Sequence, residues 1–400
     1  MSAVVTGLAV TAPNGLDTEE FWASTLAGAN AIAPISRFDA AGYPVRLGAE
    51  VRGFDPAEHL PGRLLPQTDR MTQFALAATG GALADADVDP DRFGAYDMGV
   101  VTAGAAGGFE FGQRELAALW SSGPEHVSVY QSFAWFYAVN TGQISIRHDM
   151  RGPTGVVVTE QAGGLDAIAQ ARRRLRRGTP LMVTGGMDAP LCPWGIAAQI
   201  PNGRLSHRDD PERAYLPFDT DATGYVVGEG GAILILEDAG HARDRGAPHV
   251  YGEIAGYCAT FDPRDGSSRL GAAMTGALAD AGLTPAEVDV VFADASGVAE
   301  LDRAEATAIT GLFGPHGVPV TAPKTMIGRL LSGGAPVDVA TALLAIRDSV
   351  IPPTVNVSRP VPDYALDLVR EPRITRLTNA LIVARGYHGF NAAVVVRAVR

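Results

Sequence analysis

The chain has 400 residues, of which 46% are hydrophobic and 19% charged, enough to bury a large core as one elaborate domain or as two similar halves. A formal net charge of -12 argues against general nucleic-acid binding, and no uninterrupted apolar run is long enough to span a membrane. The only two cysteines, Cys192 and Cys258, lie far apart, which indicates neither a disulfide framework nor a metal site, and a cytoplasmic protein is expected.

Short apolar strands alternate with Ala-rich helical stretches, a pattern typical of an α/β protein. The first strand is expected within residues 3–15, which lack the basic start of a signal peptide. Residues 107–120 predict a helix in which Phe109, Gly112 and Leu116 share one face, because their spacing is i, i+3, i+7.

An aromatic-rich segment follows at residues 129–148, where Phe133, Phe136 and Tyr137 are candidates for an interface or a cavity wall. An aromatic stripe at this spacing is equally compatible with an ordinary core. Trp194, within LCPWG, is a further aromatic candidate for the same cavity, although an indole in a loop can simply pack.

Residues 157–166, VVTEQAGGLD, predict a strand, a tight turn and the start of a helix, with Gln161 at the apex. A carboxamide is not appreciably deprotonated, so Gln161 cannot serve as an acyl-accepting nucleophile as a thiolate does. Late in the same helix lies a basic run, which is favoured by the helix dipole and predicts either a solvated face or a docking patch for an acidic partner. The run comprises Arg172, Arg173, Arg174, Arg176 and Arg177.

The chain contains an approximate internal repeat. Residues 153–188 predict strand, turn, helix and strand, and residues 318–354 predict a similar series before a later strand at 379–391. A polar connector at 239–249 separates the repeats, so we expect two halves, residues 1–245 and 246–400. Two halves that bring helix N-termini to a common seam predict a pocket at their pseudo-dyad.

Five motifs in register connect the sequence with a known family. They are APNG (12–15), MRGP (150–153), PFDTDATGYVVGEGGAILILED (217–238), APKTMIGR (322–329) and GYHGFN (386–391). Over essentially its whole length the chain resembles the ketosynthases of type II polyketide synthases, and most closely the chain-length factor, the catalytically silent beta subunit. The resemblance implies a thiolase-like, five-layered αβαβα fold built from two similar halves.

Active members of this family use one Cys and two His, and the resemblance places these three positions on Gln161, Asp294 and Arg329. No catalytic residue is therefore intact, whereas Lys324 and the downstream acids Asp302 and Glu305 remain in pattern. An Asp would repel a developing oxyanion, so the replacements cannot do the work of two imidazoles. We expect Asp294 and Arg329 to form an ion pair that fills the old pocket, with Gln161 hydrogen-bonded at its edge; separately solvated charges are the alternative.

The resemblance further implies an obligate heterodimer with an active ketosynthase, to which an acyl carrier protein brings substrates on phosphopantetheine; no other cofactor is implied. The growing chain would run into an interface tunnel, lined here by Phe109, Gly112, Leu116, Phe133 and Trp194. Because Gly112 and Leu116 are smaller than the Thr and Phe that would close such a tunnel early, we expect a product longer than an octaketide, about ten ketide units. The carrier protein would dock on Arg172, Arg173 and Arg176.

Three other functions remain open at this stage. The chain could decarboxylate malonyl-carrier protein to supply an acetyl primer, with Gln161 mimicking an acylated Cys; both imidazole donors are missing, so backbone N–H groups or Arg329 would have to replace them. An unrelated enzyme is a weaker interpretation, because the sequence has none of the common nucleophile, phosphate-binding or zinc motifs. A stand-alone homodimeric binding module is weaker still, because it would have to cover the apolar segment 129–148 with itself.

Overall fold

The computed structural model describes residues 2–399 and is organised around a large mixed β-sheet. Within this part of the chain the sheet has 11 strands in the order β13-β11-β10-β15-β16-β9-β1-β8-β6-β4-β5. In that order they are β13 (Asp367–Leu368), β11 (Pro319–Thr321), β10 (Val290–Phe292), β15 (Asn379–Arg385), β16 (Phe390–Arg397), β9 (Gly252–Phe261), β1 (Ala3–Thr11), β8 (Gly230–Asp238), β6 (Leu181–Asp188), β4 (Met98–Ala103) and β5 (Thr154–Val157).

The sheet contains the same arrangement twice. In the N-terminal half β5, β4 and β6 are parallel and are followed by antiparallel β8 and β1; in the C-terminal half β11, β10 and β15 are parallel and are followed by antiparallel β16 and β9. The halves join where Val4 pairs with Glu253 and Val5 with Gly252. This confirms the α/β fold of two similar halves; the boundary at 245/246 stays a prediction, and the connector before it carries a short helix, α9 (Ala239–Asp244).

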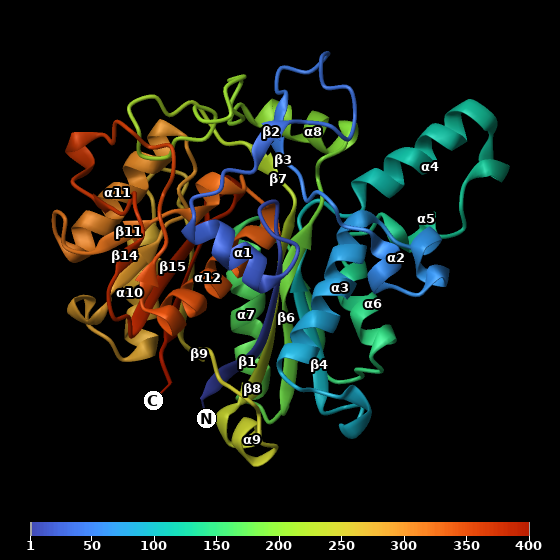
Figure 1. Ribbon diagram of the computed structural model, residues 1–400, viewed down its shortest axis with the longest axis horizontal. Coiled ribbons are helices and arrows are strands. Elements are labelled where there is room, and N and C mark those ends of the chain that lie inside the picture. Colours follow the sequence, from blue (N-terminus) through green and yellow to red (C-terminus); the bar gives the residue numbers. More distant parts are fainter. Residues whose placement is uncertain (1, 400) are drawn as a thin grey trace.

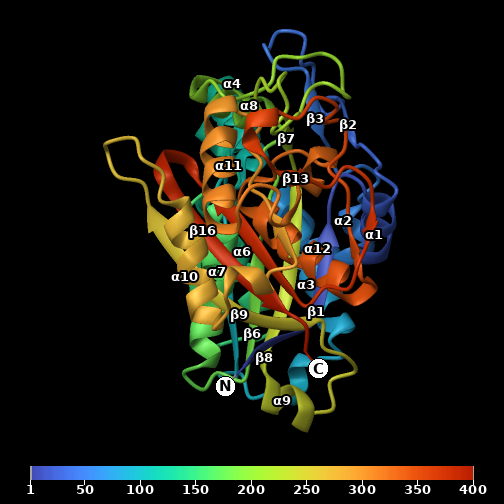
Figure 2. The same ribbon diagram turned by 90° about the vertical axis from the view of Figure 1, so that its left-hand side faces the viewer.

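Helices form three layers around the two halves of the sheet, which gives five layers in all (Figures 1 and 2). α3 (Arg70–Asp85) and α6 (Val139–Arg147) cover the outer face of the N-terminal half, and α10 (Leu270–Ala281) and α11 (Ala299–Phe313) cover the C-terminal half. The central layer is α7 (Ala162–Leu175) with α12 (Gly334–Asp348). α12 is buried over its first thirteen residues, as its almost uniformly apolar sequence requires.

The central helices approach each other closely at small residues. A Cβ added to Gly164 of α7 would lie 2.2 Å from Cδ of Pro336 in α12, so only glycine allows this packing. Gln161, at the N-cap of α7, lies against Gly334 at the start of α12. The two helix N-termini thus meet at the pseudo-dyad, as the repeat predicted.

The remaining elements surround this core. They are α1 (Thr18–Leu26), α2 (Pro56–His59), α4 (Phe109–Ser122), α5 (Gln131–Ala134) and α8 (Pro193–Gln199), with the small sheets β2 (Ile32–Pro34), β3 (Leu47–Ala49), β7 (Val227–Gly228) and β12 (Val350–Ile351), β14 (Arg373–Ile374). α4 projects away from the body of the molecule, with α5 on the return path (Figure 1). No helix among residues 2–399 is both long and apolar enough to cross a bilayer.

Candidate functional site

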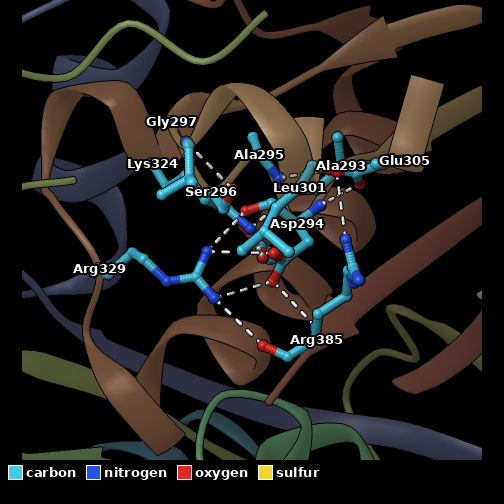
Figure 3. A network of polar contacts seen from close by, with 12 residues as sticks. Ala293, Asp294, Ala295, Ser296, Gly297, Leu301, Glu305, Lys324, Arg329 and Arg385 are labelled. Carbon is cyan, nitrogen blue, oxygen red and sulfur yellow. Dashed lines mark hydrogen bonds and ion pairs between the residues drawn. The ribbon is translucent and has the colours of Figure 1, made fainter. Parts of the chain in front are cut away.

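The candidate site lies where the carboxyl ends of the parallel strands of both halves meet, the edge at which α/β proteins place their ligands. Gln161 follows β5 and begins α7. Asp294 follows β10, and Lys324 and Arg329 follow β11. The segments that follow β10 and β11 converge on one buried cluster with Arg385 (Figure 3).

Asp294 and Arg329 form a two-pronged ion pair. Nη1 of Arg329 lies 3.1 Å from Oδ2 of Asp294, and Nη2 lies 3.1 Å from Oδ1. The same guanidinium donates to the backbone carbonyls of Asp294 and Arg385, at 3.1 and 3.2 Å. Both side chains are buried, at 1% and 5% exposure. The predicted pairing is confirmed, and the alternative of separately solvated charges is excluded.

The surroundings keep this pair ionised. Burial acts to raise the pKa of Asp294, but the charges of Arg329 and Lys324 outweigh it and hold this pKa below its ordinary value. Burial likewise opposes the charge on Arg329, yet Asp294 raises the pKa of the guanidinium well above its ordinary value. An anion and a guanidinium whose donors are already bonded therefore stand at the two positions where the resemblance predicts the imidazole donors of a condensing enzyme.

A second ring of ionisable groups holds the pair in position. The Glu305 carboxylate accepts the backbone N–H groups of Asp294 at 2.7 Å and Ala295 at 2.9 Å. Burial and the neighbouring Asp294 raise the pKa of Glu305 to about 8. The Lys324 ammonium donates to the carbonyl of Ala293 at 2.7 Å and lies 2.7 Å from the Asp338 carboxylate on α12.

Gln161 does not take part in this network, which corrects the expectation that its amide would bond to the edge of the ion pair. Its side chain is fully buried, and neither amide atom has a hydrogen-bond partner in the described structure. The carboxamide instead packs against Gly334, where an added Cβ would lie 3.2 Å from Oε1. An amide held in this way offers no attacking group and no positioned donor.

Glu160, the residue before Gln161, was missed by the sequence analysis. It adopts a left-handed backbone conformation, with φ of +51°, and burial raises the pKa of its carboxyl while Arg329 opposes the shift. Glu160, Tyr225 and Tyr387 border two cavities, one of about 540 Å³ that reaches Asp294 and Arg329, and one of about 340 Å³ that reaches Phe109. The sequence signal that could have identified Glu160 was the acidic residue itself, which stands between an apolar strand and Gln161.

Three of the five predicted tunnel residues lie together. The rings of Phe109 on α4 and Trp194 on α8 stack with centroids 5.2 Å apart and an interplanar angle of 19°. Gly112, one turn along α4, lies under the indole, because an added Cβ would come within 2.8 Å of its Cζ3. Leu116 continues the same helix and is half-exposed, whereas Phe133 of α5 packs against the buried cluster around α3.

Large exposed apolar side chains also lie on α4 and α6, on either side of α5 and directly after the edge strand β5. We call this group the exposed apolar surface over α4, α5, α6 and β5. Trp120 is 84% exposed and Val129 79% exposed, values far above those of ordinary core residues. The other large exposed apolar side chains of this surface are Leu116, Trp135, Phe136, Tyr137, Ile146 and Val158.

Arg172 does not belong to a docking patch, which corrects the grouping of Arg172 with Arg173 and Arg176. Its side chain is buried, 2.5 Å from the Asp280 carboxylate and bonded to the carbonyl of Ala255. It follows Leu165 and Ile168 at helical spacing on the inward face of α7, which is a signal the sequence contained. Arg173 and Arg176 are exposed.

Comparison with protein families and known proteins agrees with this geometry. Residues 2–242 match the model of the beta-ketoacyl synthase N-terminal domain, and residues 251–358 match the model of the C-terminal domain. The chain is 62% identical to the tetracenomycin polyketide synthase ketoacyl synthase beta subunit of Streptomyces glaucescens, over 98% of both chains. It is 57% identical to the actinorhodin polyketide putative beta-ketoacyl synthase 2 of Streptomyces coelicolor, over 99% of this chain and 98% of the relative.

Solved structures give the same result. The ishigamide ketosynthase/chain length factor superposes with a TM-score of 0.91 at 27% identity, covering 100% of this chain and 99% of that one. A chain of the AntDE:AntF complex, a type II polyketide synthase acyl-carrier protein with its hexaketide-bound ketosynthase, superposes with a TM-score of 0.89 at 28% identity over 100% and 99% of the two chains. The chain therefore belongs to the beta-ketoacyl synthase family, among the ketosynthase beta subunits, or chain-length factors, of type II polyketide synthases.

Proposed function

We propose that this chain is a catalytically silent ketosynthase homologue that pairs with an active ketosynthase and shapes the interface tunnel that sets chain length in aromatic polyketide biosynthesis. The observation that carries the proposal is the buried, two-pronged Asp294–Arg329 pair. Decarboxylation and condensation both build negative charge on an oxygen, which requires free donors. Here the guanidinium donors are already bonded to a carboxylate and to two carbonyls.

The partner is an active ketosynthase subunit, and the proposed contact is the exposed apolar surface over α4, α5, α6 and β5. A row of large exposed apolar side chains and an unpaired sheet edge are what a chain leaves uncovered when a second subunit completes them. In this arrangement α4 projects into the partner's side of the interface, so Phe109, Gly112, Leu116 and Trp194 bound the tunnel.

The geometry of α4 supports a tunnel of intermediate depth. Gly112 contributes no side chain, but the indole of Trp194 already occupies the space beside it. Leu116, one turn further along α4, is 38% exposed. From the small size of both residues we propose a product of about ten ketide units. Substrates would arrive on the phosphopantetheine arm of an acyl carrier protein, with Arg173 and Arg176 as its candidate contacts.

The test is co-purification with the active ketosynthase, followed by assay of malonyl-carrier-protein consumption and product length. Gly112→Phe is expected to shorten the product, and Gln161→Ala is expected to leave condensation near the wild-type rate. The opposite result, in which Gln161→Ala abolishes initiation and added acetyl primer restores it, would identify the chain as the primer-forming decarboxylase instead.

A further inference from the structure

Helix α4 begins without a cap of its own. Its N-cap residue is Gly108, which has no side chain to accept the free N–H groups of the first turn. Two contacts from elsewhere replace the cap. The N–H of Gly108 donates to the carbonyl of Trp135 at 2.9 Å, and the N–H of Phe111 donates to Oδ2 of Asp69 at 2.9 Å.

Asp69 is at the same time the N-cap of α3. Its other oxygen, Oδ1, accepts the N–H of Met71 at 2.9 Å, so one carboxylate joins the first turns of two helices. The side chain is 2% exposed, and Gly108 approaches it so closely that an added Cβ would lie 2.9 Å from the Asp69 Cβ. Met71 and Phe111 are 40 positions apart in sequence, so this junction fixes α4 against the body of the molecule.

A second polar contact joins α4 to α8. Oε1 of Gln113 accepts the backbone N–H of Trp194 at 2.7 Å, in the first turn of α8. This bond sets where the indole lies, because the ring stacks on Phe109 and covers Gly112. Asp69 therefore fixes α4 to the body of the molecule, and Gln113 fixes Trp194 of α8 to α4. Together the two residues hold both sides of the wall that α4 and α8 form.

We propose that Asp69 and Gln113 are positioning residues for chain length: they touch no substrate but hold α4 and Trp194 at one separation. This inference rests on the proposed function. Beside the junction lies a cavity of about 220 Å³, bordered by Asp69 and by Glu110 and Phe111 of α4, into which the first turn of α4 can shift once the junction is broken. Misplacement by about 1 Å is enough to change the outcome of an enzyme reaction, so a shifted tunnel wall is expected to change which chain lengths fit.

The chemistry of Asp69 makes a sharp variant available. Burial raises the pKa of Asp69 to about 7, so the variants are compared at pH 8, where the carboxylate is ionised and each oxygen accepts one N–H group. Asp69→Asn keeps the size of the side chain but turns one acceptor into an NH₂ donor that faces an N–H. Either α3 or α4 must therefore lose the hydrogen-bond acceptor for an N–H group of its first turn. Gln113→Leu removes the acceptor for Trp194 in the same way, at a half-buried position where the change is easily accommodated.

The experiment compares wild type, Asp69→Asn, Gln113→Leu, Gly112→Phe and a control, each co-purified with the active ketosynthase and supplied with malonyl-carrier protein. The control is Asp17→Asn, the same substitution at the N-cap of α1, an exposed site outside α4 and α8. Product lengths are read by mass spectrometry and complex formation by size-exclusion chromatography.

The expected result is a mixture of chain lengths from Asp69→Asn and Gln113→Leu, with intact complexes and undiminished malonyl consumption, while Asp17→Asn keeps a single length. A merely structural role would lower yield without changing length.

If Gly112→Phe shortens the product but Asp69→Asn and Gln113→Leu both keep the wild-type length, the positioning role is refuted and the proposed function survives. If Gly112→Phe has no effect, the proposed function fails. Should Asp69→Asn not assemble, Gln113→Leu alone decides.

Discussion

The guanidinium of Arg329 meets the carboxylate of Asp294 with two parallel contacts of 3.1 Å, at the point where the two halves of the fold converge. Both side chains are almost fully buried, at 1% and 5% exposure, so each charge in the folded state depends chiefly on the other. Under the proposed function, the stability of the site and its catalytic silence depend on the same pair of side chains.

Removing one member of the pair is expected to be far worse than removing both. Asp294→Ala or Arg329→Ala leaves a buried, unpaired charge, at a cost of about 3–5 kcal/mol in unfolding free energy, whereas Asp294→Leu with Arg329→Met should cost much less. Thermal melting of the three variants checks this. Equal losses in the single variants and the double variant would contradict it.

Gln161→Leu is expected to leave stability unchanged or to raise it. The buried carboxamide has no hydrogen-bond partner, so an apolar side chain of similar size removes a desolvation penalty without losing a bond. Gln161→Glu serves as the contrasting variant, since it would bury a carboxyl in the same place. A drop in melting temperature for Gln161→Leu comparable to that of Gln161→Glu would show that the amide has a partner in solution.

Replacing the buried Arg172 and replacing the exposed Arg176 should have different effects on the melting temperature. Arg172→Ala breaks a buried contact to Asp280 and to the carbonyl of Ala255 and should cost about 1–3 kcal/mol. Arg176→Ala changes an exposed side chain and should be neutral for stability within about 0.5 kcal/mol. If Arg176→Ala instead weakens carrier-protein binding at low salt, the docking proposal gains support; equal binding by wild type and variant would remove it.

Stability is expected to fall as pH rises from 5 to 8. Burial raises the pKa of Glu305 to about 8 and that of Asp69 to about 7, above their ordinary values near 4.5 and 3.8. Between the ordinary and the raised pKa the folded chain holds a proton that the unfolded chain has released, so the unfolding free energy decreases with pH. Each such group contributes at most about 1.4 kcal/mol per pH unit.

Urea unfolding at pH 5, 6, 7 and 8 measures this trend, and Glu305→Gln should reduce its slope above pH 6. A stability that rises steadily across this range would mean that these carboxyls are ionised in the folded protein at low pH.

Trp194 and Gly112 should behave as a coupled pair. Gly112→Ala places a methyl group 2.8 Å from the indole, so the ring must shift, and a loss of stability is expected. Trp194→Phe vacates part of that space, and the double variant should recover much of the loss. A double-mutant cycle with melting temperature as the readout checks this; additive effects would place the two side chains apart in solution.

The sequence was sufficient for features that depend on residue type and register. The internal repeat predicts the two halves, and the resemblance, which places an acid and a base at the two imidazole positions, predicts the Asp294–Arg329 pair. The spacing of Phe109 and Gly112 likewise predicts that both lie on one helix, which the structure shows as α4.

Features that depend on long-range approach were not accessible in this way. Asp280, the partner of Arg172, is 108 positions away in the sequence. The two helices that Asp69 joins, α3 and α4, come together only in the tertiary fold. The side-chain direction of Gln161 follows from the close packing of α7 on α12, which no local pattern encodes. Local patterns did indicate that Arg172 is buried and that an acid lies beside Gln161. The first residue was instead grouped with the basic run, and the second was interpreted as part of a tight turn.

The Asp294–Arg329 pair also has an evolutionary consequence. A lineage that carries it cannot regain an imidazole at either position by one substitution without stranding the other charge in the interior. Each such substitution would lower folding stability before it restored any activity, so selection would act against it. Under the proposed function, the folding cost of separating this pair keeps the subunit silent, while substitutions in the tunnel wall carry no such cost.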